Sequence, residues 1–427
     1  MTRMTAPLIL AIASVAVAGP SISYIEQGNL ASSLSYDGTV AAGNCISDQT
    51  YETFRWTQND GLQRLGLASF QVIFRAAGTP DVSYNGRRVS ASILSSDYQL
   101  TQGLWDVSTG WTETMPPPPA DGALVDDGYG STWGLSGNGQ VVTGFFWSPS
   151  YRAQASVWSA GSGVIALGQA PGISARANAC NYDGSVVGGW EEAEWGSWMP
   201  RAWRNGVKYE LSNLDGGVNQ VETVNGSGDV LGGSSRDDSL AINVATLWRW
   251  NGTSYDTQIL GALPNYFPEQ TTASILGISD DASIAVGVHV EAWGSTEGIV
   301  WTPEDGLQRA ADFFAARGVV LPEGYLILDC ADVSADASTI VCTMLDPETS
   351  DILSAVIRLR QPCPGDLNLD GQVDDSDFVL FASQYDVLDC GDPAMPGYCR
   401  ADLNNDGLVE DADFVEFAQG YDQLVCP

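Results

Sequence analysis

The segment SYDGTVAAG, residues 35–43, combines a polar Asp-Gly turn with an apolar run and a closing small residue. Asp-Gly is a strong signal for a β-hairpin, because both residues tolerate a positive φ. Six further segments share this form, and in the last two an alanine replaces the turn glycine. They begin at residues 83, 136, 181, 225, 279 and 334. A repeat every 44 to 55 residues predicts a chain built from copies of one supersecondary unit.

A bulky apolar residue follows each turn after 18 to 20 residues. These residues are Trp56, Trp105, Trp158, Trp203, Trp248 and Trp301, with Ile357 in the seventh unit. Each unit then reads as four short antiparallel strands, which is the size of a propeller blade. We interpret the repeated tryptophans as packing between blades; a sugar-binding surface is the alternative.

The two ends of the repeat region complement each other. The seventh unit stops at residue 360 before its fourth strand, whereas an unassigned strand, SISYI at residues 21–25, precedes the first unit. We expect this strand to complete the seventh unit, which would remove exposed sheet edges. The predicted fold is all-β, a seven-bladed β-propeller over residues 19–360 closed by the N-terminal strand. An open β-solenoid or a sandwich array is the alternative.

These units resemble the extracellular HAF repeat, although the His-Ala-Phe triplet of that family is absent. The segment 310–342 carries the match, with an expected helix, the sequence GVVL and a repeat that ends in SADA. The resemblance implies the fold and export from the cell, but it implies no common activity.

The N-terminal residues 1–18 contain an early arginine and then an apolar run that ends in Ala-Val-Ala. This pattern is typical of a secretory signal peptide, and the run is too short to span a bilayer. We therefore expect a secreted or cell-surface protein without a membrane span after signal removal. Acidic residues outnumber basic ones 53 to 18, which disfavours nucleic-acid partners and favours cations. Eight cysteines fit an oxidising compartment.

Two acidic segments near the C-terminus, residues 366–377 and 402–413, follow the spacing of a calcium loop. Over 25 aligned positions the two copies share 16 residues. Such a loop supplies oxygen ligands from positions 1, 3, 5, 7, 9 and 12, around a glycine at position 6. The expected ligands of two Ca²⁺ ions are Asp366, Asn368, Asp370, the Gln372 carbonyl, Asp374 and Asp377 in the first loop, and Asp402, Asn404, Asp406, the Leu408 carbonyl, Glu410 and Asp413 in the second.

Proline and glycine before each loop exclude an entering helix, whereas apolar residues at i, i+3 and i+7 after each loop predict an exiting helix. Two loop–helix units with Asp at position 12 resemble a type I dockerin over residues 364–427. We assign residues 361–427 to this small α-helical module. The resemblance implies that it folds on calcium and binds a cohesin-like or other surface protein. It places the partner contacts at loop positions 10 and 11, which are Asp375, Ser376, Asp411 and Ala412.

Antiparallel helices, as in dockerins, would bring the end of one helix near the start of the other. This arrangement favours the disulfides Cys390–Cys399 and Cys363–Cys426, with pairing inside each copy as the alternative. In the repeat region, Cys330 and Cys342 flank one hairpin, and we expect a cross-strand bridge between them.

The repeats offer little catalytic chemistry. His289 is the only histidine and alternates within a strand, which favours a structural role over a catalytic triad or a zinc site. The loop WEEAEWGSW, residues 190–198, is a candidate for binding a glycan or a peptide, with an ordinary exposed loop as the alternative. We therefore expect a secreted, non-catalytic binding or display protein that the calcium module attaches to an extracellular partner. The alternative is a dockerin-borne glycoside hydrolase that degrades polysaccharides, or an accessory protein.

Overall fold

The computed structural model describes residues 19–46, 51–68, 78–95, 99–114, 129–148, 150, 152–193, 196–211, 217–237, 242–264, 271–291, 294–360, 363, 365–392, 394–404 and 406–421. The expected signal peptide, residues 1–18, lies outside this set. Within the set, no helix is long and apolar enough to cross a membrane.

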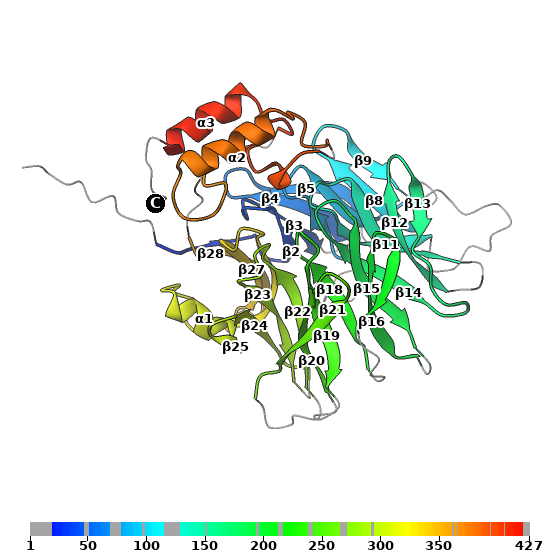
Figure 1. The fold of residues 1–427 in the computed structure, drawn as a ribbon. Coiled ribbons are helices and arrows are strands. Elements are labelled where there is room, and N and C mark those ends of the chain that lie inside the picture. The colour runs from blue at the N-terminus through cyan, green and yellow to red at the C-terminus, as the bar shows by residue number, and fades with distance from the viewer. Residues whose placement is uncertain are drawn as a thin grey trace, which may run out of the picture.

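The strands form propeller-like, four-stranded antiparallel units that stand side by side, and one parallel pairing, between Asn243 and Thr272, joins the fifth unit to the sixth (Figure 1). The first three units are β2 (Asn29–Leu34), β3 (Val40–Ile46), β4 (Tyr51–Thr57) and β5 (Gly61–Ala68); β6 (Asp81–Val82), β7 (Arg88–Leu94), β8 (Leu100–Asp106) and β9 (Gly110–Glu113); and β10 (Gly130–Leu135), β11 (Val141–Trp147), β12 (Ala153–Ser159) and β13 (Gly163–Ala166). The next three are β14 (Ala175–Cys180), β15 (Val186–Glu192), β16 (Trp198–Arg204) and β17 (Val207–Glu210); β18 (Gln220–Val224), β19 (Val230–Asp237), β20 (Ile242–Trp250) and β21 (Tyr255–Gly261); and β22 (Thr272–Ile278), β23 (Ala285–Val290), β24 (Thr296–Thr302) and β25 (Gly306–Arg309).

The last unit takes its strands from both ends of the repeat region. It contains β26 (Leu326–Val333), β27 (Thr339–Leu345) and β28 (Ile352–Arg358), and its fourth strand is β1 (Ser21–Tyr24). β1 pairs antiparallel with β28, with Ile22 opposite Ile357, in the place that the sequence predicts for this strand. The N-terminal strand therefore covers the edge that β28 would otherwise expose.

The repeated turns make a circuit of hydrogen bonds, which we call the turn ring. Its links run from amide N–H to acceptor as follows: Tyr36 to the Tyr84 carbonyl (2.9 Å), Tyr84 to the Gly137 carbonyl (2.8 Å), Asn138 to the Tyr182 carbonyl (2.9 Å), Tyr182 to the Gly226 carbonyl (3.1 Å), Gly226 to Asp280 Oδ1 (2.7 Å), Asp280 to the Ala335 carbonyl (2.8 Å), and Asp336 to the Tyr36 carbonyl (3.0 Å). The last link joins the seventh turn to the first, so the circuit is closed.

The repeated tryptophans pack between neighbouring units, as interpreted from the sequence. Trp105 lies in one apolar cluster with Val40 and Ala42 of the preceding unit. Trp248 is fully buried and packs in the same way against Val186 and Ala202. Five of the six rings are buried and therefore unavailable as a sugar-binding surface, whereas Trp158 is partly buried against Leu104 of the preceding unit.

The helices lie outside the sheets. The short helix α1 (Ala310–Ala316) precedes the last unit and buries Phe313 and Phe314 in an apolar cluster that contains residues of both the sixth and the last unit. The C-terminal region contributes α2 (Asp375–Tyr385), the 3₁₀ turn η3 (Gly397–Cys399) and α3 (Asp411–Tyr421). Figure 1 shows α2 and α3 side by side at one end of the molecule, above the first strands of the repeat region.

The cysteines follow the sequence prediction in part. Cys390 and Cys399 form a disulfide, as expected. Cys363 is also disulfide-bonded, whereas its expected partner, Cys426, lies outside the described residues.

The disulfide predicted between Cys330 and Cys342 is not formed, which corrects the expectation from the sequence. The two residues stand opposite each other in β26 and β27, but they are free thiols with their sulfur atoms 3.0 Å apart. Both are buried, and burial raises the pKa of the Cys342 thiol well above its ordinary value. A thiol that stays protonated is a poor nucleophile for forming a disulfide.

Candidate metal loops and the covered propeller mouth

The first acidic loop is held in a tight turn by hydrogen bonds from its backbone to its own carboxylates. The two oxygens of Asp366 accept from the backbone N–H groups of Asp370 (3.0 Å) and Gly371 (2.9 Å). Those of Asp377 accept from the N–H groups of Asn368 and Asp374, both at 2.9 Å. Gly371 has a φ of 87°, the left-handed conformation that a sharp turn at position 6 requires.

The second loop repeats this arrangement. Asp402 accepts from the N–H groups of Asp406 (3.0 Å) and Gly407 (2.9 Å). Asp413 accepts from those of Asn404 (3.0 Å) and Glu410 (2.9 Å). In both loops the carboxylates at positions 1 and 12 are at least 95% buried, since their exposed fractions are 5% and 0%. Two of the expected ligands in each loop, at positions 1 and 12, are therefore buried beside the same stretch of backbone, whereas the side chains at positions 3 and 5 are exposed in both loops.

The donor set fits calcium. Burial, together with the nearby charges of Asp413 and Asp406, raises the pKa of Asp402 to about 7. Burial likewise raises the pKa of Asp366. Several carboxylates held together in a low-dielectric site repel one another, and a hard divalent cation removes that repulsion through oxygen ligands.

The two helices run antiparallel and are joined reciprocally. Tyr385, at the end of α2, donates from its hydroxyl to Asp411 at the start of α3, over 2.7 Å. Tyr421, at the end of α3, donates in the same way to Asp375 at the start of α2. Between these contacts the rings of Phe381 and Phe417 are fully buried, with centroids 5.1 Å apart. The second loop is braced further by an antiparallel bridge between Leu408 and Asp389.

The four residues predicted to contact a partner are all exposed. Two of them, Asp411 and Asp375, already accept hydrogen bonds from the hydroxyl groups of the tyrosines at the helix ends. Sequence reasoning missed their apolar neighbours, Phe378, Val379, Phe414 and Val415, which are 43–65% exposed. The rings of Phe378 and Phe414 have centroids 6.5 Å apart, so these two rings face each other across the helices, and Val379 and Val415 follow them in sequence. We call these four exposed side chains the helix patch. The equivalence of Val379 and Val415 in the two copies is the signal that could have revealed it.

The second residue of each repeated turn faces the centre of the turn ring, which we call the propeller mouth. Tyr36, Tyr84 and Tyr182 occupy this position in three units, and neighbouring ring centroids lie 5.5 Å apart. Gly137 and Gly226 occupy it in two others. A Cβ at Gly137 would lie 2.7 Å from the ring of Tyr182, so glycine at this position makes room for the tyrosines.

A buried carboxylate completes the propeller mouth. Oδ1 of Asp280 accepts from the Tyr84 hydroxyl (2.8 Å) and from the N–H of Gly226 (2.7 Å). Its side chain is 8% exposed, and burial raises its pKa above the ordinary value. A Cβ at Gly226 would lie 2.6 Å from this carboxylate, so the second glycine is needed for the same reason as the first.

The C-terminal module covers this mouth. The ring of Tyr398 lies 4.7 Å from that of Tyr182, between centroids. The guanidinium carbon of Arg400 lies 4.8 Å from the ring centroid of Tyr36, and its Nη2 lies 3.9 Å from Oδ2 of Asp280. The segment that carries both side chains is fixed by the Cys390–Cys399 disulfide, and Arg400 lies two residues before Asp402, the first ligand of the second loop.

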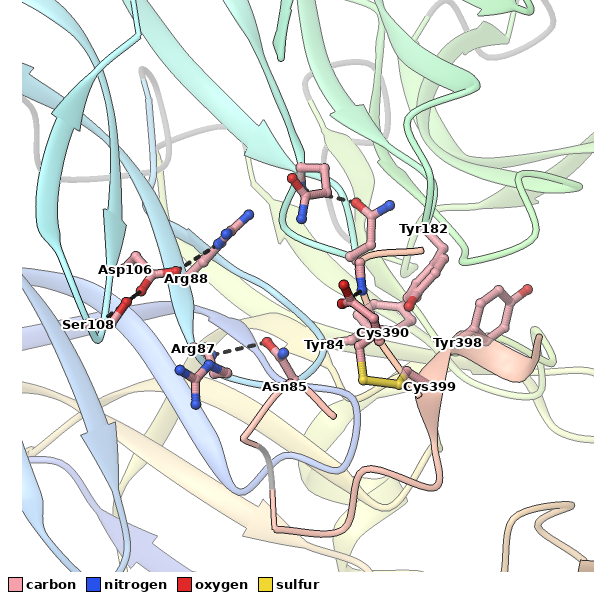
Figure 2. A pocket seen from close by; sticks show the side chains of 16 residues that line it. Tyr84, Asn85, Arg87, Arg88, Asp106, Ser108, Tyr182, Cys390, Tyr398 and Cys399 are labelled. Carbon is pink, nitrogen blue, oxygen red and sulfur yellow. Dashed lines mark hydrogen bonds and ion pairs between the residues drawn. A yellow bond between two sulfur atoms is a disulfide. The ribbon is translucent and has the colours of Figure 1, made fainter. Parts of the chain in front are cut away.

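A cavity of about 240 Å³ remains beside this contact. Figure 2 shows Tyr84, Tyr182 and Tyr398 gathered on the side where the disulfide lies, with Arg88 and Asp106 on the other side. The cavity is therefore lined by both the repeat region and the C-terminal module.

Residues of the loop proposed for glycan or peptide binding are largely buried or paired with other residues of the protein. Trp190 is buried and stacks on Trp198 with ring centroids 4.0 Å apart. Glu191 is also buried, where it pairs with Arg201 (3.1 Å) and Lys208 (2.9 Å). Glu194 and Trp195 lie outside the described residues. The described part of this segment is thus neither an open binding loop nor an ordinary exposed one.

His289 sits in β23 with 1% of its surface exposed. Among the described residues neither of its ring nitrogens has a hydrogen-bond partner, and burial lowers its pKa. This environment fits the structural role expected from the sequence.

No family model and no curated protein matches this sequence. Solved propellers share its general shape. TolB from Acinetobacter baumannii is 12% identical, with a TM-score of 0.42, and the match covers 76% of this chain and 66% of that one. The β-propeller domain of the Trilobed protease from Pyrococcus furiosus is 11% identical, with a TM-score of 0.49 and coverage of 78% and 99%. The Cps50 (Swd1) propeller of Myceliophteria thermophila is 10% identical, with a TM-score of 0.48 and coverage of 78% and 99%. These similarities concern the fold alone.

Proposed function

We propose that this chain is a secreted, non-catalytic binding or display protein. Its seven-bladed propeller, residues 19–360, is attached to an extracellular or cell-surface partner by a calcium-binding, dockerin-like module, residues 361–427. The observation that supports this best is the pair of matching loops, each with buried carboxylates at positions 1 and 12.

The proposed metal content is two Ca²⁺ ions, one in each loop. Bound calcium would neutralise the clustered carboxylates. Asp377 and Asp413 lie in the first turns of α2 and α3, so each would tie its loop to the helix that follows. Because these helices carry the helix patch, calcium binding and partner binding would be linked.

The proposed partner contact is the helix patch together with Ser376 and Ala412. A group of exposed apolar side chains on a small module is typical of a protein-binding site. The chemistry of the patch favours an apolar protein surface, such as that of a cohesin-like protein, over nucleic acid. The net charge of −35 argues in the same direction.

The proposal is tested by calcium-dependent capture on immobilised full-length protein, using cell-surface and secreted proteins of the native organism. Specific capture should require calcium and should be lost in the variant V379E/V415E. The matched control is V320E, which changes another exposed valine (85% exposed) within the repeat region and should capture normally. Capture that survives both chelation and V379E/V415E would contradict the proposal.

A glycoside hydrolase remains the second candidate, because Asp81, Glu222 and Asp332 line one central cavity of about 110 Å³. Two of these carboxylates already hold neighbouring units together. Asp81 accepts from the N–H of Leu135, and Asp332 accepts from that of Leu34, both at 2.9 Å. Release of reducing sugars from polysaccharides, lost in the variant E222Q, would favour the hydrolase over the binding protein.

A further inference from the structure

The propeller mouth has the composition of a cation site. Tyr36, Tyr84 and Tyr182 present aromatic rings, and Asp280 presents a buried carboxylate oxygen. The faces of aromatic rings and a carboxylate both attract a positive charge. We call these four side chains the tyrosine–aspartate seat.

Neighbouring groups hold the carboxylate of the seat in a position that suits a bound cation. Oδ1 of Asp280 is fixed by two hydrogen bonds, whereas Oδ2 has no hydrogen-bond partner among the described residues and faces Arg400. The space around it depends on Gly226, where any Cβ would meet both the carboxylate and, at 2.8 Å, the hydroxyl of Tyr84. A buried carboxylate with one oxygen left for a ligand is costly unless a cation approaches it.

The cation that faces this carboxylate is the guanidinium group of Arg400, which is planar. The guanidinium of Arg400 lies over Tyr36 at 4.8 Å and near Tyr398 at 5.5 Å, while its Nη1 donates to the Leu367 carbonyl over 2.9 Å. A guanidinium can stack on aromatic rings while it donates hydrogen bonds in its own plane. A lysine ammonium is more strongly hydrated and cannot stack, so the seat favours arginine over lysine.

We infer that the tyrosine–aspartate seat is a binding site for the guanidinium group of an arginine side chain, filled in this structure by Arg400 of the same chain. The C-terminal module thereby acts as an internal ligand of the propeller. An arginine on another protein would compete for the same seat whenever the module moves away. This inference does not depend on the calcium proposal, since it rests on the propeller mouth and on Arg400.

The test is chemical rescue of the full-length variant R400G in calcium-containing buffer. The variant should lose protection from amide hydrogen exchange in residues 394–404. Millimolar ethylguanidinium should restore that protection and raise the unfolding temperature, whereas ethylammonium at equal ionic strength should not. The matched control is R309G, which removes an arginine that pairs with Glu297 on the surface, and it should show no selective rescue.

Two second-site variants assign the rescue to the seat. Rescue should be lost in R400G/D280N, and in R400G/Y36L it should need about fivefold more ethylguanidinium because the stacking partner is gone. The Y36L variant keeps the test valid if D280N does not fold. Equal responses to the two cations, equal rescue in R309G, or undiminished rescue in R400G/Y36L would each overturn the inference.

Discussion

Arg358 in the last unit donates from Nη2 to the carbonyl oxygen of Gly38 in the first unit, over 3.1 Å. The same contact recurs between other neighbouring units: Arg55 donates to the Gly86 carbonyl (2.8 Å), Arg88 to that of Gly139 (3.0 Å) and Arg204 to that of Gly228 (2.7 Å). The acceptor is in each case the glycine of a repeated turn. Few basic residues are present in this chain, and four of them hold one unit to the next.

Loss of the contact at the ring closure should destabilise the protein. Arg358 is buried, so R358M should lower the free energy of unfolding by about 1.5–3 kcal/mol, the usual contribution of a hydrogen bond from a charged group. Urea unfolding measures this. The control R64M changes a half-exposed arginine that pairs with Glu52 on the surface, and it should cost less than about 1 kcal/mol. Equal costs for both variants would argue against a special role for the closure.

The Cys390–Cys399 disulfide should stabilise the segment that covers the propeller mouth. The double variant C390S/C399S should lower the stability of the C-terminal module by about 2–3 kcal/mol, because the short closed loop no longer restricts the unfolded chain. Hydrogen exchange over residues 394–404 reports this locally. Reductant should have no further effect on that segment in the variant. Unchanged exchange would show that other contacts hold it.

His289 should make the stability depend on pH in one direction. Burial lowers its pKa in the folded protein below the ordinary value of about 6.5. As the pH falls, His289 therefore takes up a proton in the unfolded chain before it does so in the folded protein. The free energy of unfolding is at its full value above about pH 6.5 and decreases below that pH. Urea unfolding between pH 8 and 5 in saturating calcium should reveal this loss.

The variant H289L supplies the control for that pH dependence. It should show a smaller loss of stability on acidification, and at neutral pH it should be at least as stable as the original protein, because a buried polar group without a partner is removed. An identical pH profile in both proteins would assign the dependence to other groups.

The regular parts of this fold could be predicted from the sequence because their signals are local. A turn, a strand and a tryptophan at constant spacing define each unit, and the shortage of one strand at the end of the repeats indicates the place of β1. The Cys390–Cys399 pair followed from the antiparallel helices that the dockerin resemblance implies.

The propeller mouth could not be predicted in this way, because the second position of the turn varies between Tyr, Gly, Asp and Ala. Only closure of the ring brings Tyr36 and Asp280 to one place. Docking of the module then adds Arg400 from a distant part of the chain. The helix patch was missed for a related reason: a helical apolar pattern does not show which apolar residues find a partner.

Calorimetric titration of the calcium-free full-length protein tests whether the two C-terminal loops bind calcium. We predict two Ca²⁺ ions per chain, and one ion in each of the variants D377A and D413A, because each variant removes the buried position-12 carboxylate of one loop. Absence of binding at millimolar calcium, or two ions still bound by both variants, would show that these loops are not the calcium sites.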